Sequence, residues 1–232
     1  MNKKFPIIEA LKEYKTDFHA LQFLSLDSNS PFGNLTLSWI EIVTRIECVN
    51  DLIITLYTDF EDLHNQLRQT QFSTLDRNYR QKFYTEQIFY WLRKTADDLI
   101  SLISVLTDYK TQNSYPKKIK ISSIGEFLKS TKSSNVFNGD FDKFKPYLQK
   151  LNEISNCFKH SFINLQISNL LGLEYTVVHA LALQYNDLSN QEKFYSLELR
   201  QVLDEYDNFL AYTKKYIKLN LTNPKPDKFS QK

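Results

Sequence analysis

The stretch from Asn152 to His160 carries the side chains best suited to chemistry in this chain. At about 3.6 residues per helical turn, Asn152, Asn156 and His160 are each about 40° from the next and form one stripe. Lys159 and Asn164 flank that stripe. An imidazole, two amides and an ammonium group on one face can contact a phosphate or another polar partner. The spacing therefore predicts a functional face, with His160, Asn156 and Lys159 as the candidate catalytic residues.

A structural explanation of the same residues stays open. Lys159 and His160 fall in the last turn of the helix that the pattern predicts. Cations are favoured there by the helix dipole and can bond the free carbonyl groups. Presence of these two residues does not by itself establish a functional site.

Other chemistry finds less support in the sequence. Cys157 and His160 are spaced like half of a zinc site, but the chain has no second Cys/His pair at such spacing. The four glycines are isolated, so no phosphate-binding loop of the P-loop or dinucleotide type is expected. We therefore expect no metal and no cofactor.

The remaining histidines fit ordinary structural roles. His19 and His64 fall on amphipathic helical patterns without a polar cluster around them. His179 lies in a β-branched, aromatic stretch, where we expect a half-buried histidine with satisfied hydrogen bonds.

The elements that must position these residues are mainly helical. Apolar residues recur in steps of three and four along most of the chain. Ser-x-x-Glu patterns at Ser123–Glu126 and Ser189–Glu192 predict helix starts, and Pro146 suits the first turn of the helix that carries Asn156. The predicted helices span residues 7–24, 35–67, 75–109, 123–129, 141–162 and 189–219. An irregular strand is predicted over 174–179, with a partner at 163–167.

Composition supports one helical domain. The 232 residues are 42% hydrophobic and 14% aromatic, enough for a sizeable core, and include only four glycines and six prolines. We predict an all-α, up-and-down bundle of about five main helices with a small β excursion before the last helix. A single domain is expected over residues 1–221, followed by a flexible tail over 222–232.

Charge and cysteine content point to the cytoplasm. The net charge is +2, and the only cysteines are isolated, which fits a reducing compartment. No signal-peptide apolar region or membrane-spanning run is found, so a cytoplasmic protein without membrane contact is expected. Lysines crowd residues 110–145 and the tail from Lys214; a solvated surface is the commoner explanation, and contact with nucleic acid or a membrane surface is the alternative.

The order of these features resembles the HEPN superfamily of helical-bundle domains over roughly residues 75–220. A long helix with Arg93 and Asp97, a lysine-rich loop, the stretch 123–128 and then Leu151-x4-Asn156-x2-Lys159-His160 carry the resemblance. The resemblance implies a bundle that pairs as a homodimer across the motif helix. Many members are metal-independent ribonucleases of toxin–antitoxin and phage-defence systems.

The catalytic motif of that superfamily is only partly present. It consists of an arginine, four to six residues and a histidine, with a polar residue often directly after the arginine. The resemblance implies that the histidine transfers a proton and the arginine holds the phosphate. Asn156 matches the polar residue and His160 the histidine, but Ser155 occupies the arginine position. Lys159 or Arg93 is left to supply the positive charge.

These observations lead to a functional hypothesis with two alternatives. The first is a HEPN-like homodimer that binds RNA, a nucleotide or a protein without catalysis, in defence or toxin–antitoxin biology. The second is a metal-independent endoribonuclease that uses His160 with Lys159 or Arg93. The third is a helical scaffold unrelated to that superfamily.

Overall fold

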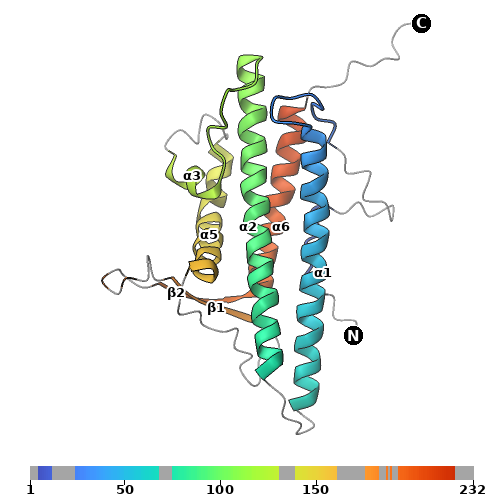
Figure 1. Cartoon of the computed structure of the whole chain (residues 1–232), viewed down its shortest axis with the longest axis vertical. Coiled ribbons are helices and arrows are strands. Elements are labelled where there is room, and N and C mark those ends of the chain that lie inside the picture. The colour runs from blue at the N-terminus through green and yellow to red at the C-terminus, as the bar shows by residue number, and fades with distance from the viewer. Residues whose placement is uncertain are drawn as a thin grey trace, which may run out of the picture.

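The structure, a computed structural model, describes residues 5–11, 24–67, 75–130, 139–160, 176–182, 187, 189 and 193–222. These residues form an all-α bundle with a two-stranded antiparallel sheet before the last α-helix, as predicted (Figure 1). The elements in chain order are α1 (Leu35–Leu67), α2 (Leu75–Gln112), α3 (Ile124–Lys129), the 3-10 helix η2 (Gly139–Phe144), α5 (Lys145–His160), β1 (Val177–Ala182), β2 (Lys193–Glu198), α6 (Leu199–Tyr216) and the π-helix η4 (Ile217–Leu221).

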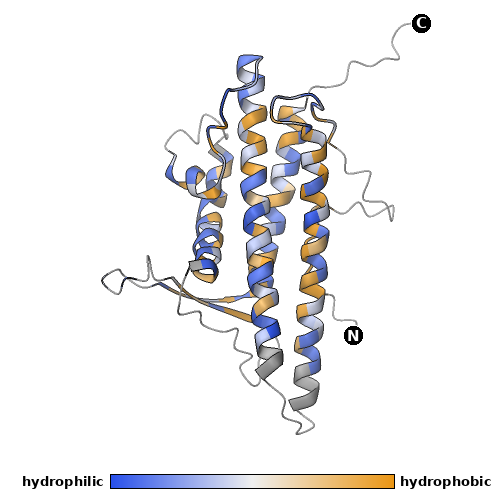
Figure 2. Ribbon diagram, in the orientation of Figure 1, coloured by the Kyte–Doolittle hydropathy of each residue, from blue (hydrophilic) through white to orange (hydrophobic). Residues whose placement is uncertain are grey.

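Two long antiparallel helices form the centre of the molecule. The predictions for 35–67 and 75–109 are confirmed, although α2 runs three residues further, to Gln112. Figure 2 shows both helices banded by hydrophobic and hydrophilic residues, as expected when one face of each is buried. Their register is fixed by two ion pairs, Arg45 with Asp98 at 2.6 Å and Arg80 with Asp59 at 3.7 Å.

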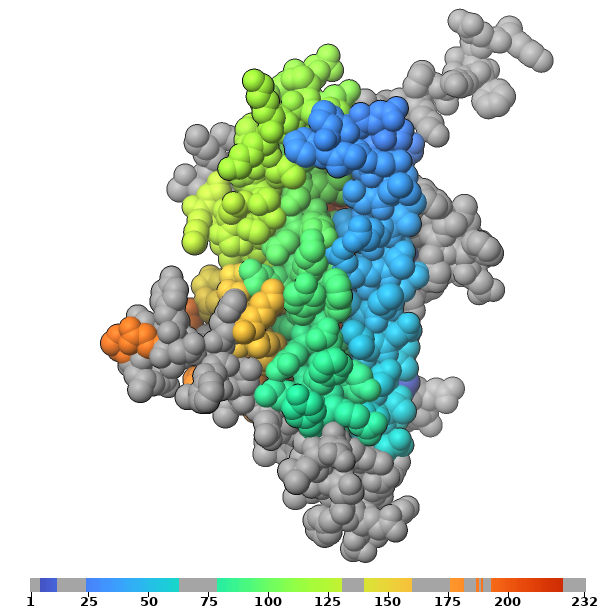
Figure 3. Space-filling model, in the orientation of Figure 1, coloured from blue at the N-terminus to red at the C-terminus, as the bar shows by residue number. Residues whose placement is uncertain are grey.

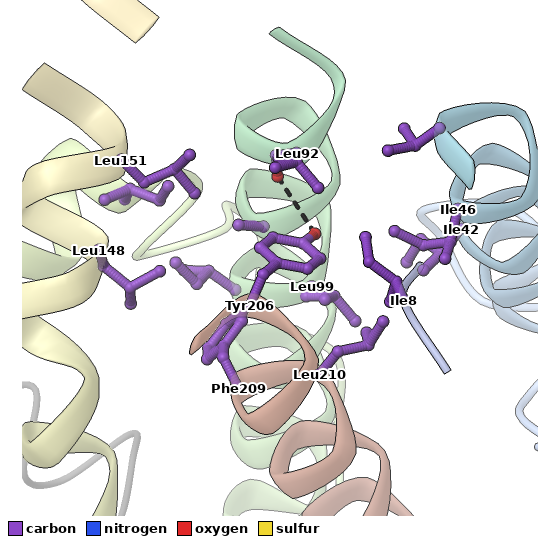
Figure 4. Packing of buried hydrophobic residues seen from close by; sticks show 14 of the residues in the cluster. Ile8, Ile42, Ile46, Leu92, Leu99, Leu148, Leu151, Tyr206, Phe209 and Leu210 are labelled. Atoms are coloured by element: carbon purple, nitrogen blue, oxygen red, sulfur yellow. Dashed lines mark hydrogen bonds between the residues drawn. The ribbon is translucent and has the colours of Figure 1, made fainter. Parts of the chain in front are cut away.

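The last helix packs parallel to α2 and closes the core. Tyr206 of α6 is fully buried, and its hydroxyl donates to the Leu92 carbonyl oxygen at 3.1 Å (Figure 4). Leu148 and Leu151 of α5 approach this core from the other side of α2 (Figure 4). A buried tyrosine stays compatible with the core because its hydroxyl has a hydrogen-bond partner.

Local signals correctly predict the beginning of α3 and α5. The Ser123 side chain accepts from the Glu126 amide at 3.2 Å, as in a capping box. The Glu126 carboxylate reaches back to the Ser122 amide at 2.6 Å rather than to that of Ser123. Pro146 lies in the first turn of α5, where its missing N–H costs no helical hydrogen bond.

The predicted first helix is wrong where the structure describes it. Residues 5–9 have no helical structure, and Ala10 and Leu11 form a turn; residues 12–23 lie outside the described part. The Asn50 side chain pairs with the amide and carbonyl of Ile8. Because side chains of other helices satisfy this backbone, it does not need the hydrogen bonds of a helix.

The predictions around the sheet need two corrections. β1 pairs with β2, whereas the partner predicted at 163–167 lies outside the described residues. The last α-helix begins at Leu199, not at Ser189. Half-buried Tyr195 and Leu197 alternate with exposed neighbours in β2, and the ladder to β1 supplies their backbone partners. A local capping pattern therefore loses to long-range strand pairing.

None of the helices in the described ranges combines the length and apolarity that a membrane span requires. Residues 223–232 of the predicted tail lie outside the described part of the chain. The division into a domain over 1–221 and a tail stays a prediction.

Candidate functional site

The candidate site lies where the C-terminal half of α5 meets α2. Figure 3 shows the end of α5, in yellow-orange, at the molecular surface against the green atoms of α2. The two helices are held together by apolar side chains, including Phe158 on Phe89 with ring centroids 5.5 Å apart. This packing turns Asn156 toward the edge of α2 on which Arg93 lies.

Arg93 reaches across from α2 to α5. Its Nη1 donates to the Asn156 Oδ1, and its Nε lies 3.8 Å from Asp97 Oδ2. The Arg93 side chain is 19% exposed, so this contact is largely shielded from water. Because Asn156 accepts through its oxygen, its Nδ2 is oriented to donate to a partner.

Asp97 anchors the same cluster to α3. Its Oδ1 accepts from the Ile124 amide at 2.7 Å. Burial raises the pKa of the Asp97 carboxyl group, and the Ile124 hydrogen bond and the charge of Arg93 only partly offset that effect. Asp97 is thus a positioning group for Arg93 and for the start of α3.

Lys159 provides a second cation beside Arg93. Its ammonium nitrogen lies 4.7 Å from the centroid of the Tyr90 ring, a cation–π contact. Partial burial lowers the pKa of Lys159, and repulsion from Arg93 lowers it further. Two cations and one carboxylate therefore share this site, which favours an anionic partner.

Ser155, at the arginine position of the HEPN motif, faces the core. It is 1% exposed, and its hydroxyl has no hydrogen-bond partner among the described residues. The interpretation that Ser155 belongs to the apolar face of its helix is confirmed. A cationic side chain at this position would point away from Asn156 and into the apolar interior.

His160 is the last residue of α5, and its side chain lies outside the described part, as do the side chains of His19 and His64. The structure thus brings Asn156 and Lys159 together with Arg93, while the position of the imidazole at 160 stays a prediction.

His179 departs from the expected satisfied histidine. It is half-buried in β1, and its ring stacks on Phe194 with centroids 5.7 Å apart. Both ring nitrogens are buried without a hydrogen-bond partner among the residues that the structure describes.

Cys157 is a structural residue. It is 5% exposed, and its thiol donates to the Glu153 carbonyl oxygen at 3.0 Å. Burial raises the pKa of the thiol to about 11, so it stays protonated at neutral pH. Within the described ranges, no group of three His, Cys, Asp or Glu side chains is arranged to hold a metal ion.

Glu153 fastens the β-hairpin to the functional helix. Its carboxylate accepts from the Tyr195 hydroxyl, from Lys193 at 3.1 Å and from Gln149 at 2.9 Å. Burial alone would raise the pKa of Glu153, but these hydrogen bonds outweigh it and hold the pKa below 4.5. The hairpin is therefore tied to α5 one turn before Asn156.

Replacing Tyr195 with phenylalanine is expected to raise the pKa of Glu153 toward 4.5. Because the folded pKa is depressed, the hairpin contact stabilises the protein above the unfolded pKa and is lost as pH falls through the folded pKa. The substitution should remove about 1 kcal/mol at neutral pH. Carboxyl-carbon NMR titration measures the pKa of Glu153, and Phe194→Leu, on the exposed face of β2, is the control that should leave it unchanged.

The sequence identified Asn156, Lys159, Arg93 and Asp97 but missed Tyr90. A signal for Tyr90 was present, since it lies three residues before Arg93 and thus on the same side of α2. The adjacent acids Asp97 and Asp98 diverge as expected, but both are half-buried and paired rather than solvated.

Comparison with known proteins gives no further assignment. No protein-family model matches the chain, and no significant match is found among curated proteins or solved structures.

Proposed function

We propose that this protein is a HEPN-like homodimer that binds RNA without cleaving it, as a binding or regulatory module in a defence or toxin–antitoxin setting. The observation that carries the proposal is the placement of Ser155 in the core next to a surface cluster of Arg93, Asn156 and Lys159. The position that the superfamily uses for its phosphate-holding arginine is closed, while cations for binding are present beside it.

The cluster suits a phosphodiester better than a neutral ligand. Lys159 has no carboxylate within ion-pair distance among the described residues, and the Asn156 amide nitrogen points its donor capacity at a partner. The exposed ring of Tyr90 beside them offers a stacking surface for an unpaired base. Single-stranded RNA satisfies all three groups.

A metal-independent ribonuclease is the second candidate. Its supporting observation is that Arg93 reaches Asn156, the neighbour of position 155, from another helix. Against it stands the engagement of that guanidinium by Asn156 and Asp97, which leaves less of it to stabilise a reacting phosphate. An unrelated helical scaffold would use the same contacts only to join α2 to α5.

Binding of a fluorescently labelled single-stranded RNA tests the proposal. Lys159→Ala should weaken affinity roughly tenfold at low salt and reduce the salt dependence by the share of one phosphate contact. Lys150→Ala is the matched control, because Lys150 lies on the same helix but pairs with Glu205 at 3.5 Å. Equal affinities for the two variants would contradict the proposed site, and no binding by the natural protein would support the scaffold.

Light scattering tests the dimer separately. The natural protein should have twice the 27.5 kDa mass of one chain at micromolar concentrations. A strict monomer over that range would contradict the homodimer.

A further inference from the structure

The N-terminal segment, residues 5–11, lies in a groove between α1 and α6. Figure 4 shows Ile8 between Ile42 and Ile46 of α1 on one side and Leu210 of α6 on the other. Ile8 is 1% exposed and Leu11 is 4% exposed, so the segment supplies part of the core between the two helices.

The groove recognises the main chain of this segment from the α1 side. The Asn50 amide accepts from the Ile8 N–H at 2.8 Å and donates to the Ile8 carbonyl oxygen at 3.0 Å. Asn50 is 7% exposed, so these bonds form out of water. A side-chain amide that pairs with both polar groups of one residue imitates a neighbouring β-strand.

The α6 side recognises the next two residues. One carboxylate oxygen of Asp207 accepts from the Glu9 amide at 2.7 Å and from the Ala10 amide at 2.6 Å. Charge-assisted bonds of this kind are stronger than neutral ones. Together, Asn50 and Asp207 bind the backbone of residues 8–10 whatever their side chains, while the apolar side chains at 8 and 11 fill the groove.

We propose that the α1–α6 groove is a peptide-binding groove that exchanges its own N-terminal segment for that of a second copy of the chain. Every contact that holds the segment is available equally to the same segment of another molecule, which is the condition for exchange of an element between protomers. The proposal does not depend on the RNA-binding function.

The chain length allows the exchange. The Leu35 amide donates to the Asp27 carbonyl at 2.9 Å, which fixes the chain after residue 24 near the start of α1. The level of Asn50 lies fifteen residues along α1, about 22 Å away. The 13 steps from Leu11 to Leu24 can span up to about 45 Å, twice that separation, so the connection does not force the segment into its own groove.

A peptide in trans tests the groove. In the full-length Ile8→Asp variant, the charged side chain should expel the protein's own segment, and a labelled peptide of residues 1–11 should bind in its place and raise the melting temperature. The same peptide with N-methyl groups on Glu9 and Ala10 lacks the two donors to Asp207 and should bind at least tenfold more weakly. A peptide of scrambled sequence should not bind.

Three results would overturn the proposal: no binding to the folded variant, equal binding of the N-methylated peptide, or equal binding of the scrambled peptide. If Ile8→Asp does not fold, hydrogen exchange of the natural protein decides. The amides of Ile8, Glu9 and Ala10 should exchange through a local opening, at least tenfold faster than that of Leu99 in α2. Exchange of all four at one rate, by global unfolding, would mean that the segment never leaves its groove.

Discussion

Replacing Ser155 with arginine is expected to lower the free energy of unfolding by about 3–5 kcal/mol, because it places an unpaired charge and a long side chain in the core. Ser155 is 1% exposed and follows Ile154, which is fully buried. For a chain of this size, the loss corresponds to a fall in melting temperature of about 10 °C. Calorimetry or circular dichroism measures both quantities.

Ser155→Ala is the matched control. Its hydroxyl has no hydrogen-bond partner among the described residues, so its removal should change stability by less than about 1 kcal/mol. A Ser155→Arg variant as stable as the natural protein, and newly able to cleave RNA, would show that position 155 opens onto an active site.

Replacing Arg93 with methionine is expected to cost about 2 kcal/mol, since it leaves the largely buried Asn156 and Asp97 oxygens without their cation. A double-mutant cycle with Asn156→Ala isolates the bond between the two helices and should give a coupling energy of about 1–2 kcal/mol. Denaturant unfolding of the four proteins supplies the values.

Lys94→Met is the control for the loss of one positive charge from α2. Lys94 is exposed and pairs with Asp98 at 2.5 Å on the same helix, so its loss should cost no more than about 0.5 kcal/mol. A coupling energy near zero between Arg93 and Asn156 would mean that the contact does not form in solution.

Most of the helical structure could be predicted because it depends on local patterns. The spacing of Trp39, Ile46 and Ile53 fixes the buried face of α1, and these residues are indeed buried. The Ser123 cap and Pro146 likewise set the starts of α3 and α5 through contacts within a few residues. Such signals do not depend on the rest of the fold.

The errors arise where distant segments decide the structure. Ile7, Ile8 and Leu11 have helical spacing, yet Asn50 and Asp207 bind their backbone from positions 42 to 198 residues away. Ser189–Glu192 has the spacing of a helix cap, yet Phe194 and its neighbours pair with β1. No local pattern carries this information.

The candidate site was predictable in part for the same reason. The stripe of Asn156 and His160 follows from one helix, whereas the contact of Arg93 with Asn156 depends on how α2 packs against α5. The sequence raised Arg93 as one of two possible sources of charge but could not decide between them. Tyr90 was missed because its value lies only in the cation that α5 places over it.

Incubation of RNA with the natural protein and with His160→Ala, in the presence of a metal chelator, tests most directly whether this cluster holds RNA without reacting with it. Binding without catalysis predicts intact RNA with both proteins at concentrations that saturate the complex. Cleavage by the natural protein that disappears in His160→Ala would contradict it and identify an active ribonuclease.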